Sequence, residues 1–177
     1  MEKQAVPTGE NKLDYYYGFK KCFKYETYLD NIPRHLRIHM TRFRISSHCL
    51  PIEVQRYNKK RKARVERKCD ICNLDEMGDE EHYLLRCCNS EIAYGREQFI
   101  KNIKTSNEQL EQFNNKNLFG YCMAMKDPAV QAPMSGFVKL ILDTFREETQ
   151  NSRQTNAVAP VKTKSGRLVK KTNKLNL

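Results

Sequence analysis

Residues 69–88 read CDICNLDEMGDEEHYLLRCC and decide how this chain folds. Cys69 and Cys72 are separated by two residues, so a tight turn brings both thiols to one ion. Nine residues separate Cys72 from His82, and Cys87 or Cys88 supplies a further thiol. Zinc favours four nitrogen and sulfur ligands in a tetrahedron, with no open position when its role is structural. The segment therefore predicts one structural Zn2+ site, built from Cys69, Cys72, His82 and either Cys87 or Cys88.

The acidic residues before the histidine predict how His82 is presented. Asp79, Glu80 and Glu81 occupy the first turn of a short expected helix, where carboxylates suit the helix dipole. His82 and Cys87 do not share a face of an ideal helix, so we expect this helix to end or distort before Cys87. The wider acidic set, Asp75, Glu76, Asp79, Glu80 and Glu81, could in principle hold magnesium, but a helix N-terminus and a solvated acidic loop are the simpler interpretation.

The cysteine count favours metal over disulfides. The chain has seven cysteines, an odd number, and most of them fall in this one segment. The first residues lack the apolar stretch of a secretory signal, and no apolar run approaches the roughly 20 residues of a membrane span. We therefore expect an intracellular protein, nuclear or cytoplasmic, that does not enter membranes and keeps its thiols reduced.

A strongly basic run leads into the first cysteine. The chain has a net charge of +11, and such an excess of cations attracts polyanions by counterion release. The run is solvated surface, a nuclear-import signal or a phosphate-binding surface, and the last two are compatible. The phosphate-contacting candidates within it are Lys59, Lys60, Arg61, Lys62, Arg64, Arg67 and Lys68.

A second basic element precedes this run. Pro33 fits the first turn of a helix that continues to residue 44 and breaks near Ser46. Leu36, Met40 and Phe43 share one face, which makes the helix amphipathic. Its basic side chains are further candidates for phosphate contact: Arg34, Arg37, Arg42 and Arg44.

Residues 13–29 are rich in aromatic side chains with helical spacing. Phe19 and Phe23 are four residues apart, and Tyr16 lies on the same face. These rings either form the core of a domain without tryptophan or stack on unpaired bases.

Further helical patterns cover 90–103, a start at 106–109, 117–125 and 133–149, and strand patterns are scarce. The expected fold is mostly α: a small helical domain with a Cys3His zinc-stapled loop–helix and a disordered basic C-terminal tail. We expect a disordered N-terminus (1–12), an aromatic and basic helical segment (13–57), a basic run with the zinc-binding module (58–90), a helical C-terminal part (91–149) and a disordered basic tail (150–177).

Several of these stretches resemble the region downstream of the polymerase domain in reverse transcriptases of non-LTR retroelements. The similar pieces include RFRISSH (42–48), LPIE (50–53), RKCDIC (67–72) and GDEEHYLLRC (78–87). The resemblance implies that the metal ligands are Cys69, Cys72, His82 and Cys87. It also implies a retroelement fragment or a host protein derived from one. The Tyr-x-Asp-Asp motif of a polymerase is absent, so we expect no catalytic residues and no polymerase activity.

Three functions remain open at this stage. The favoured one is a zinc-stabilised module that binds nucleic acid, with RNA or single-stranded DNA preferred to duplex. The second is a zinc-stapled scaffold for a protein partner. The third, a hydrolytic enzyme, is disfavoured because four protein ligands leave zinc no open position.

Overall fold

The computed structural model describes residues 12–22, 24–57, 60–107, 110 and 112–155. The chain divides into two compact units, residues 1–146 and 147–177. The described part of the second unit is the last stretch of one helix. All residues that the sequence singles out for metal or nucleic acid belong to the first unit.

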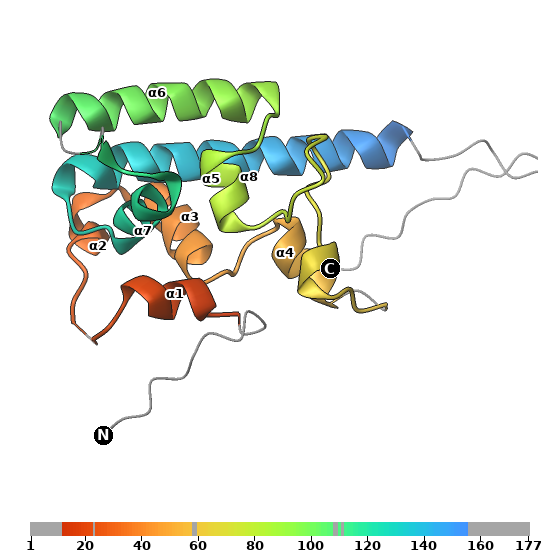
Figure 1. Cartoon of the computed structure of the whole chain (residues 1–177), viewed down its shortest axis with the longest axis horizontal. Coiled ribbons are helices and arrows are strands. Elements are labelled where there is room, and N and C mark those ends of the chain that lie inside the picture. Colours follow the sequence, from red (N-terminus) through yellow and green to blue (C-terminus); the bar gives the residue numbers. More distant parts are fainter. Residues whose placement is uncertain (1–11, 23, 58–59, 108–109, 111, 156–177) are drawn as a thin grey trace, which may run out of the picture. The chain divides into compact units, whose positions relative to one another are not determined.

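Helices make up nearly all of the regular structure (Figure 1). Among the described residues there is no β-strand, and the β pairing consists of an isolated bridge between Lys68 and Met77. The prediction of a mostly α fold is therefore confirmed. The elements are α1 (Asp14–Phe19), α2 (Tyr28–Asn31), α3 (Arg34–Arg44), α4 (Pro51–Val54), the 3-10 turns η1 (Gln55–Tyr57) and η2 (Arg64–Glu66), α5 (Glu80–Leu85), α6 (Ser90–Ser106), α7 (Asn115–Ala124) and α8 (Pro128–Thr155).

The aromatic segment forms a much shorter helix than its spacing suggests. Helix α1 ends at Phe19, and Lys20 already has an extended backbone. Gly18 lowers the helix propensity at this point. The core interpretation holds for Tyr15, whose ring lies 5.1 Å from that of Phe119 in α7, whereas Tyr17 remains exposed.

Helix α3 begins at Arg34, and Pro33 is its N-cap residue instead of part of the first turn, where the sequence pattern places it. The last residue of α3 lies at the centre of a buried cluster. Arg44 is 2% exposed. Its Nε donates to the carbonyl of Met123 at 2.9 Å, and its guanidinium forms an ion pair with Glu26. The guanidinium carbon lies 4.9 Å from the ring centre of Phe19 and 4.8 Å from that of Tyr28. Arg44 therefore joins α1, α2, α3 and α7 from within.

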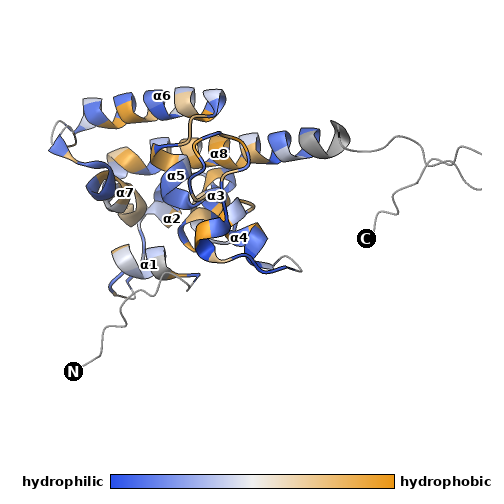
Figure 2. Cartoon of the chain, turned by 45° about the vertical axis from the view of Figure 1, so that its right-hand side comes forward, coloured by the Kyte–Doolittle hydropathy of each residue, from blue (hydrophilic) through white to orange (hydrophobic). Residues whose placement is uncertain are grey.

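Helices α6 and α8 lie side by side (Figures 1 and 2), and apolar side chains of the two helices pack against each other. The rings of Phe99 and Phe137 stack with centres 5.3 Å apart. A Cβ atom at Gly95 would lie 2.2 Å from Cδ2 of Leu140, so a larger residue there would force the end of that leucine side chain to move. The surrounding core includes Met40, Phe43, Leu50, Tyr83, Leu84, Ile92, Ile103, Val138, Ile141 and Leu142.

The C-terminal boundaries differ from those expected. Helix α8 starts at Pro128, before the predicted position 133, and continues to Thr155, so residues 150–155 are helical rather than part of the tail. The predicted helix start at 106–109 falls partly on 108–109, and most of the N-terminus and of the tail also lies outside the described residues. Within the described ranges, no helix has both the length and the apolar composition that a membrane crossing requires.

Candidate metal centre and cationic surface

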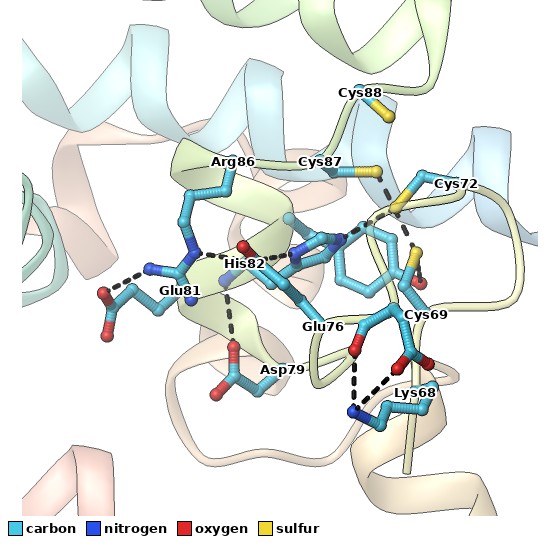
Figure 3. Close-up of polar contacts among 12 residues, drawn as sticks. Lys68, Cys69, Cys72, Glu76, Asp79, Glu81, His82, Arg86, Cys87 and Cys88 are labelled. Atoms are coloured by element: carbon cyan, nitrogen blue, oxygen red, sulfur yellow. Dashed lines mark hydrogen bonds and ion pairs between the residues drawn. The ribbon is translucent and has the colours of Figure 1, made fainter. Parts of the chain in front are cut away.

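The four predicted ligands converge on one point (Figure 3). Their ligand atoms all lie within 4.8 Å of one another, so the group could hold a metal ion. The two sulfurs of Cys69 and Cys87 are 4.0 Å apart, and the sulfur of Cys72 lies 3.4 Å from Nε2 of His82. Three of the four residues are buried, and Cys72 is partly exposed.

A short hairpin positions the first two thiols. The amide of Cys69 donates to the carbonyl of Glu76 at 2.9 Å, and the amide of Gly78 donates to the carbonyl of Arg67 at 2.8 Å. A Cβ atom on Gly78 would lie 2.9 Å from Pro51 and 3.2 Å from the Cα of Cys69. The hairpin therefore packs directly on α4, and only glycine allows this approach.

Helix α5 presents the histidine, as the acidic residues predict. Asp79 is the N-cap residue, and its Oδ1 accepts the amide of His82 at 2.9 Å. The hydroxyl of Tyr15 donates to the other carboxylate oxygen at 2.7 Å. Glu80 accepts from Nε2 of His48 at 2.9 Å and is buried. These carboxylates are thus structural partners rather than a solvated acidic loop.

The helix ends before the last ligand, also as predicted. Helix α5 stops at Leu85, and the amide of Cys87 turns back to the carbonyl of His82 at 2.7 Å. Arg96 of α6 donates to the carbonyls of Leu84 at 3.0 Å and Cys87 at 2.6 Å. Burial lowers the pKa of this guanidinium. Arg96 therefore attaches the turn that contains Cys87 to helix α6.

His82 has a carboxylate partner on its other nitrogen. Nδ1 of His82 lies 3.0 Å from Oε2 of Glu76, and Nε of Arg86 donates to the same oxygen at 2.8 Å. Arg86 also contacts Glu81 at 2.7 Å. These contacts orient the imidazole so that Nε2 points toward the thiols. Since a carboxylate can only accept, Nδ1 carries the proton and donates it to Glu76, an arrangement common around metal-bound imidazoles.

The electrostatics of the group favour a thiolate at Cys69. The hydrogen bond with Cys87 lowers the pKa of Cys69, and the bonds with His82 and Tyr83 act in the same direction, against the opposing effect of burial. The same bond with Cys69, together with burial, raises the pKa of Cys87. Burial opposes protonation of His82, but its bonds to Cys69 and Glu76 raise its pKa overall. The deprotonated sulfur is the form that binds metals.

Cys87, not Cys88, lies in the group. Cys87 is fully buried, whereas Cys88 is exposed and its sulfur lies 3.2 Å from the side-chain oxygen of Asn73 (Figure 3). The spacing leaves this choice open, and the geometry agrees with the residue that the family resemblance implies.

Arg44 does not belong to the predicted cationic surface. The sequence predicts a phosphate contact for this side chain, but aromatic rings and Glu26 enclose it, so no phosphate can reach it. Arg34 and Arg42 are exposed on α3. Arg37 is partly buried, and its guanidinium donates to the carbonyl of Ile32 at 3.0 Å.

In the described part of the basic run, the first basic residues are exposed and the later ones contact other residues. Lys60, Arg61 and Lys62 are exposed, and Lys59 lies outside the described residues. Arg64 stands over the ring of Tyr15 at 5.5 Å, and Nε of Arg67 donates to the carbonyl of Lys62 at 3.1 Å. Nζ of Lys68 donates to the carbonyl of Asp75 at 2.7 Å.

Comparison of the chain with models of known protein families, with curated proteins and with solved structures finds no match. The resemblance to retroelement reverse transcriptases therefore stays a prediction that depends on the motifs alone.

Several residues that contact the candidate metal ligands were not predictable from the sequence. Glu76 and Arg96 hold His82 and Cys87 in place, but neither belongs to a spacing pattern. Tyr83 also contributes, because its hydroxyl lies within hydrogen-bond distance of the sulfur of Cys69, at 3.1 Å. The sequence shows only that polar residues occur near the predicted ligands along the chain. It does not indicate which ligand each of them contacts.

Proposed function

We propose that the chain is a zinc-stabilised, basic nucleic-acid-binding module without polymerase activity, resembling the zinc-binding region of retroelement reverse transcriptases. One observation carries the proposal: a Cys3His group that could hold a metal follows in sequence a cationic run in which Lys60, Arg61 and Lys62 are exposed. The metal would fix the fold beside the run, and the cations would contact phosphates of RNA or single-stranded DNA.

Zinc is the ion that fits the group. With Zn–S of about 2.3 Å and Zn–N of about 2.0–2.1 Å, a regular tetrahedron places two sulfurs about 3.8 Å apart and a sulfur and a nitrogen about 3.5 Å apart. The structure has 4.0 Å between the sulfurs of Cys69 and Cys87 and 3.4 Å between Cys72 and His82. Thiolate and imidazole ligands in this geometry suit zinc better than harder cations such as magnesium.

The charges around the site support a polyanionic partner. Arg34 and Arg42 on α3, and Arg61 and Lys62 before η2, are exposed cations of the first unit. The whole chain carries a net charge of +11. Each phosphate that such residues neutralise releases condensed counterions, which favours nucleic acid and makes binding depend on salt.

The acidic residues near the site support a role without catalysis. The carboxylate of Asp79 is occupied by a helix cap and by Tyr15, and that of Glu80 by Ser46 and His48. Four protein ligands around zinc leave no position for a reacting water. Metal-dependent cleavage of labelled oligonucleotides by the purified chain would contradict this part of the proposal.

Metal analysis combined with binding measurements tests the proposal. The purified chain is expected to contain one zinc, and Cys69→Ser to lose it. The affinity for labelled single-stranded RNA should fall steeply between about 50 and 200 mM salt. A salt-independent affinity, or no binding, would remove the nucleic-acid function. A zinc-containing chain that binds no nucleic acid would instead favour a scaffold for a protein partner.

A further inference from the structure

A cationic cavity is lined by residues that precede the four candidate metal ligands in the sequence. It has a volume of about 550 Å³ and falls in the size range of small-ligand sites. No acidic residue lines it within the described part of the chain. Its polar and aromatic lining consists of Arg56, Tyr57, Arg61, Lys62, Arg64 and Arg67.

The inner wall of the cavity is held in place by contacts to the rest of the fold. Nη1 of Arg67 donates to the carbonyl of Ile52 in α4 at 3.1 Å. Arg64 stands over Tyr15 and lies 3.9 Å from the carboxylate of Asp79, the residue that caps the helix of His82. Because these side chains are already positioned, an anion that enters the cavity meets ordered positive charge.

The outer part offers charge and an aromatic face. Arg61 and Lys62 are exposed and line the same cavity. Tyr57, the last residue of η1, is 70% exposed although it is a large aromatic residue. Its ring is not a core ring, and exposed tyrosine rings beside cations are the usual stacking platforms for unpaired bases.

We propose that this cavity takes one unpaired nucleotide, with its phosphate held by Arg61 and Lys62 and its base stacked on Tyr57. The inference rests on the proposed nucleic-acid function and adds to it one contact point, which accounts for the preference for single strands. A base inside a duplex presents no free face to Tyr57, so the cavity favours single strands. An acidic peptide would satisfy the cations but would leave the ring without a partner.

The test compares single strands and duplex for variants of one ring. Tyr57→Ala should weaken binding of a short labelled oligouridylate about 5- to 150-fold, the loss expected for one base–aromatic contact. It should leave duplex affinity and the salt slope unchanged, and Tyr57→Phe should retain single-strand binding. Tyr94→Ala, which removes a tyrosine that is 66% exposed on α6 outside the cavity, should behave as the wild type.

The role of the two cations is tested separately, through the salt dependence of binding. Replacement of Arg61 and Lys62 by glutamine together should reduce the salt slope for single strands by about 1.4, because two phosphate contacts are lost. Circular dichroism of each variant shows whether the fold is kept, and all four residues are exposed enough for substitution without loss of core packing.

Three outcomes would overturn the inference. Tyr57→Ala could bind single strands as well as the wild type, or could lose single-strand and duplex affinity equally. Polyglutamate could also displace oligouridylate as effectively as unlabelled oligouridylate does. In each case salt-dependent binding by the wild type would leave the proposed function standing, whereas a wild type that binds no nucleic acid would refute the proposed function itself.

Discussion

Glu76 should tune metal affinity although it is not a ligand. In the variant Glu76→Gln, an oxygen remains to accept the Nδ1 proton of His82, but the negative charge is lost. The wild-type carboxylate lies 3.0 Å from that nitrogen. A charged partner keeps the imidazole in the right tautomer and raises its basicity as a ligand, so its loss weakens the metal bond.

The size of the effect follows from exposure. Loss of such a partner typically weakens metal binding about 10- to 100-fold. The side chain of Glu76 is 39% exposed and also pairs with Arg86, so water and a second charge already screen it. We therefore expect the lower limit, about 10-fold, which corresponds to about 1.4 kcal/mol.

A competition assay measures this change. The zinc-loaded chain is titrated with a chromogenic chelator at neutral pH and constant ionic strength, and the affinity of Glu76→Gln is compared with that of the wild type. Asp75→Asn is the matched control, because Asp75 is next in the chain, is 85% exposed and pairs only weakly with Lys68 at 3.6 Å. It removes the same charge without contact to His82.

Two results would refute the reasoning. Glu76→Gln could hold zinc as tightly as the wild type, which would mean that the carboxylate has no role at the metal. Asp75→Asn could weaken zinc as much as Glu76→Gln, which would mean that general loop charge, not the bond to His82, matters. Nitrogen NMR of the imidazole adds an independent check, because the proton should reside on Nδ1.

Three further predictions concern the ligands and the buried charges. Cys87→Ser should lose zinc on metal analysis, whereas Cys88→Ser should keep one ion per chain, and equal loss in both would contradict the ligand assignment. Arg44→Met should lower the free energy of unfolding by about 3 kcal/mol in urea, the lower limit for breaking a buried ion pair, because Glu26 is partly exposed and keeps Lys20 as a partner. Burial opposes ionisation of Glu26, but bonds to Lys20 and Arg44 lower its pKa below the usual 4.5. Its ionised form therefore stabilises the fold above pH 4.5, and this contribution is lost as the pH falls through the lowered folded value. The difference in stability between the wild type and Glu26→Gln should shrink in acid, and a difference that stays constant with pH would exclude this contribution.

The sequence predicts best what depends on local spacing. The separation of Cys69 and Cys72, and the acidic start of the helix that carries His82, depend on a few neighbouring residues, and the structure agrees with both. The periodic helices 34–44 and 133–149 are also found, although the second extends further at both ends. These features can be predicted from short stretches of sequence because they depend only on the geometry of one turn or one helix.

The features that the sequence misses depend on contacts between distant segments. A helical projection places Arg44 with solvated arginines, because it contains no information on the aromatic rings of α1 and α2 that enclose the side chain. The partner of His82 depends on the register of the hairpin that brings Glu76 beside it. The cavity next to Tyr57 exists only because η1 and residues 61–67 face each other.

The contacts of Arg96 make the metal group inseparable from the rest of the domain. Its guanidinium reaches from α6 to the turn of Cys87, and Tyr15 of α1 steadies the cap of α5 from another side. An excised peptide of residues 65–90 would leave both supports behind and should coordinate zinc less tightly than the whole domain. We therefore expect that the four ligands and their loop, transferred alone into another protein, would not form an independent zinc-binding unit. Duplication or shuffling of the ligands during evolution would have to transfer the helices as well.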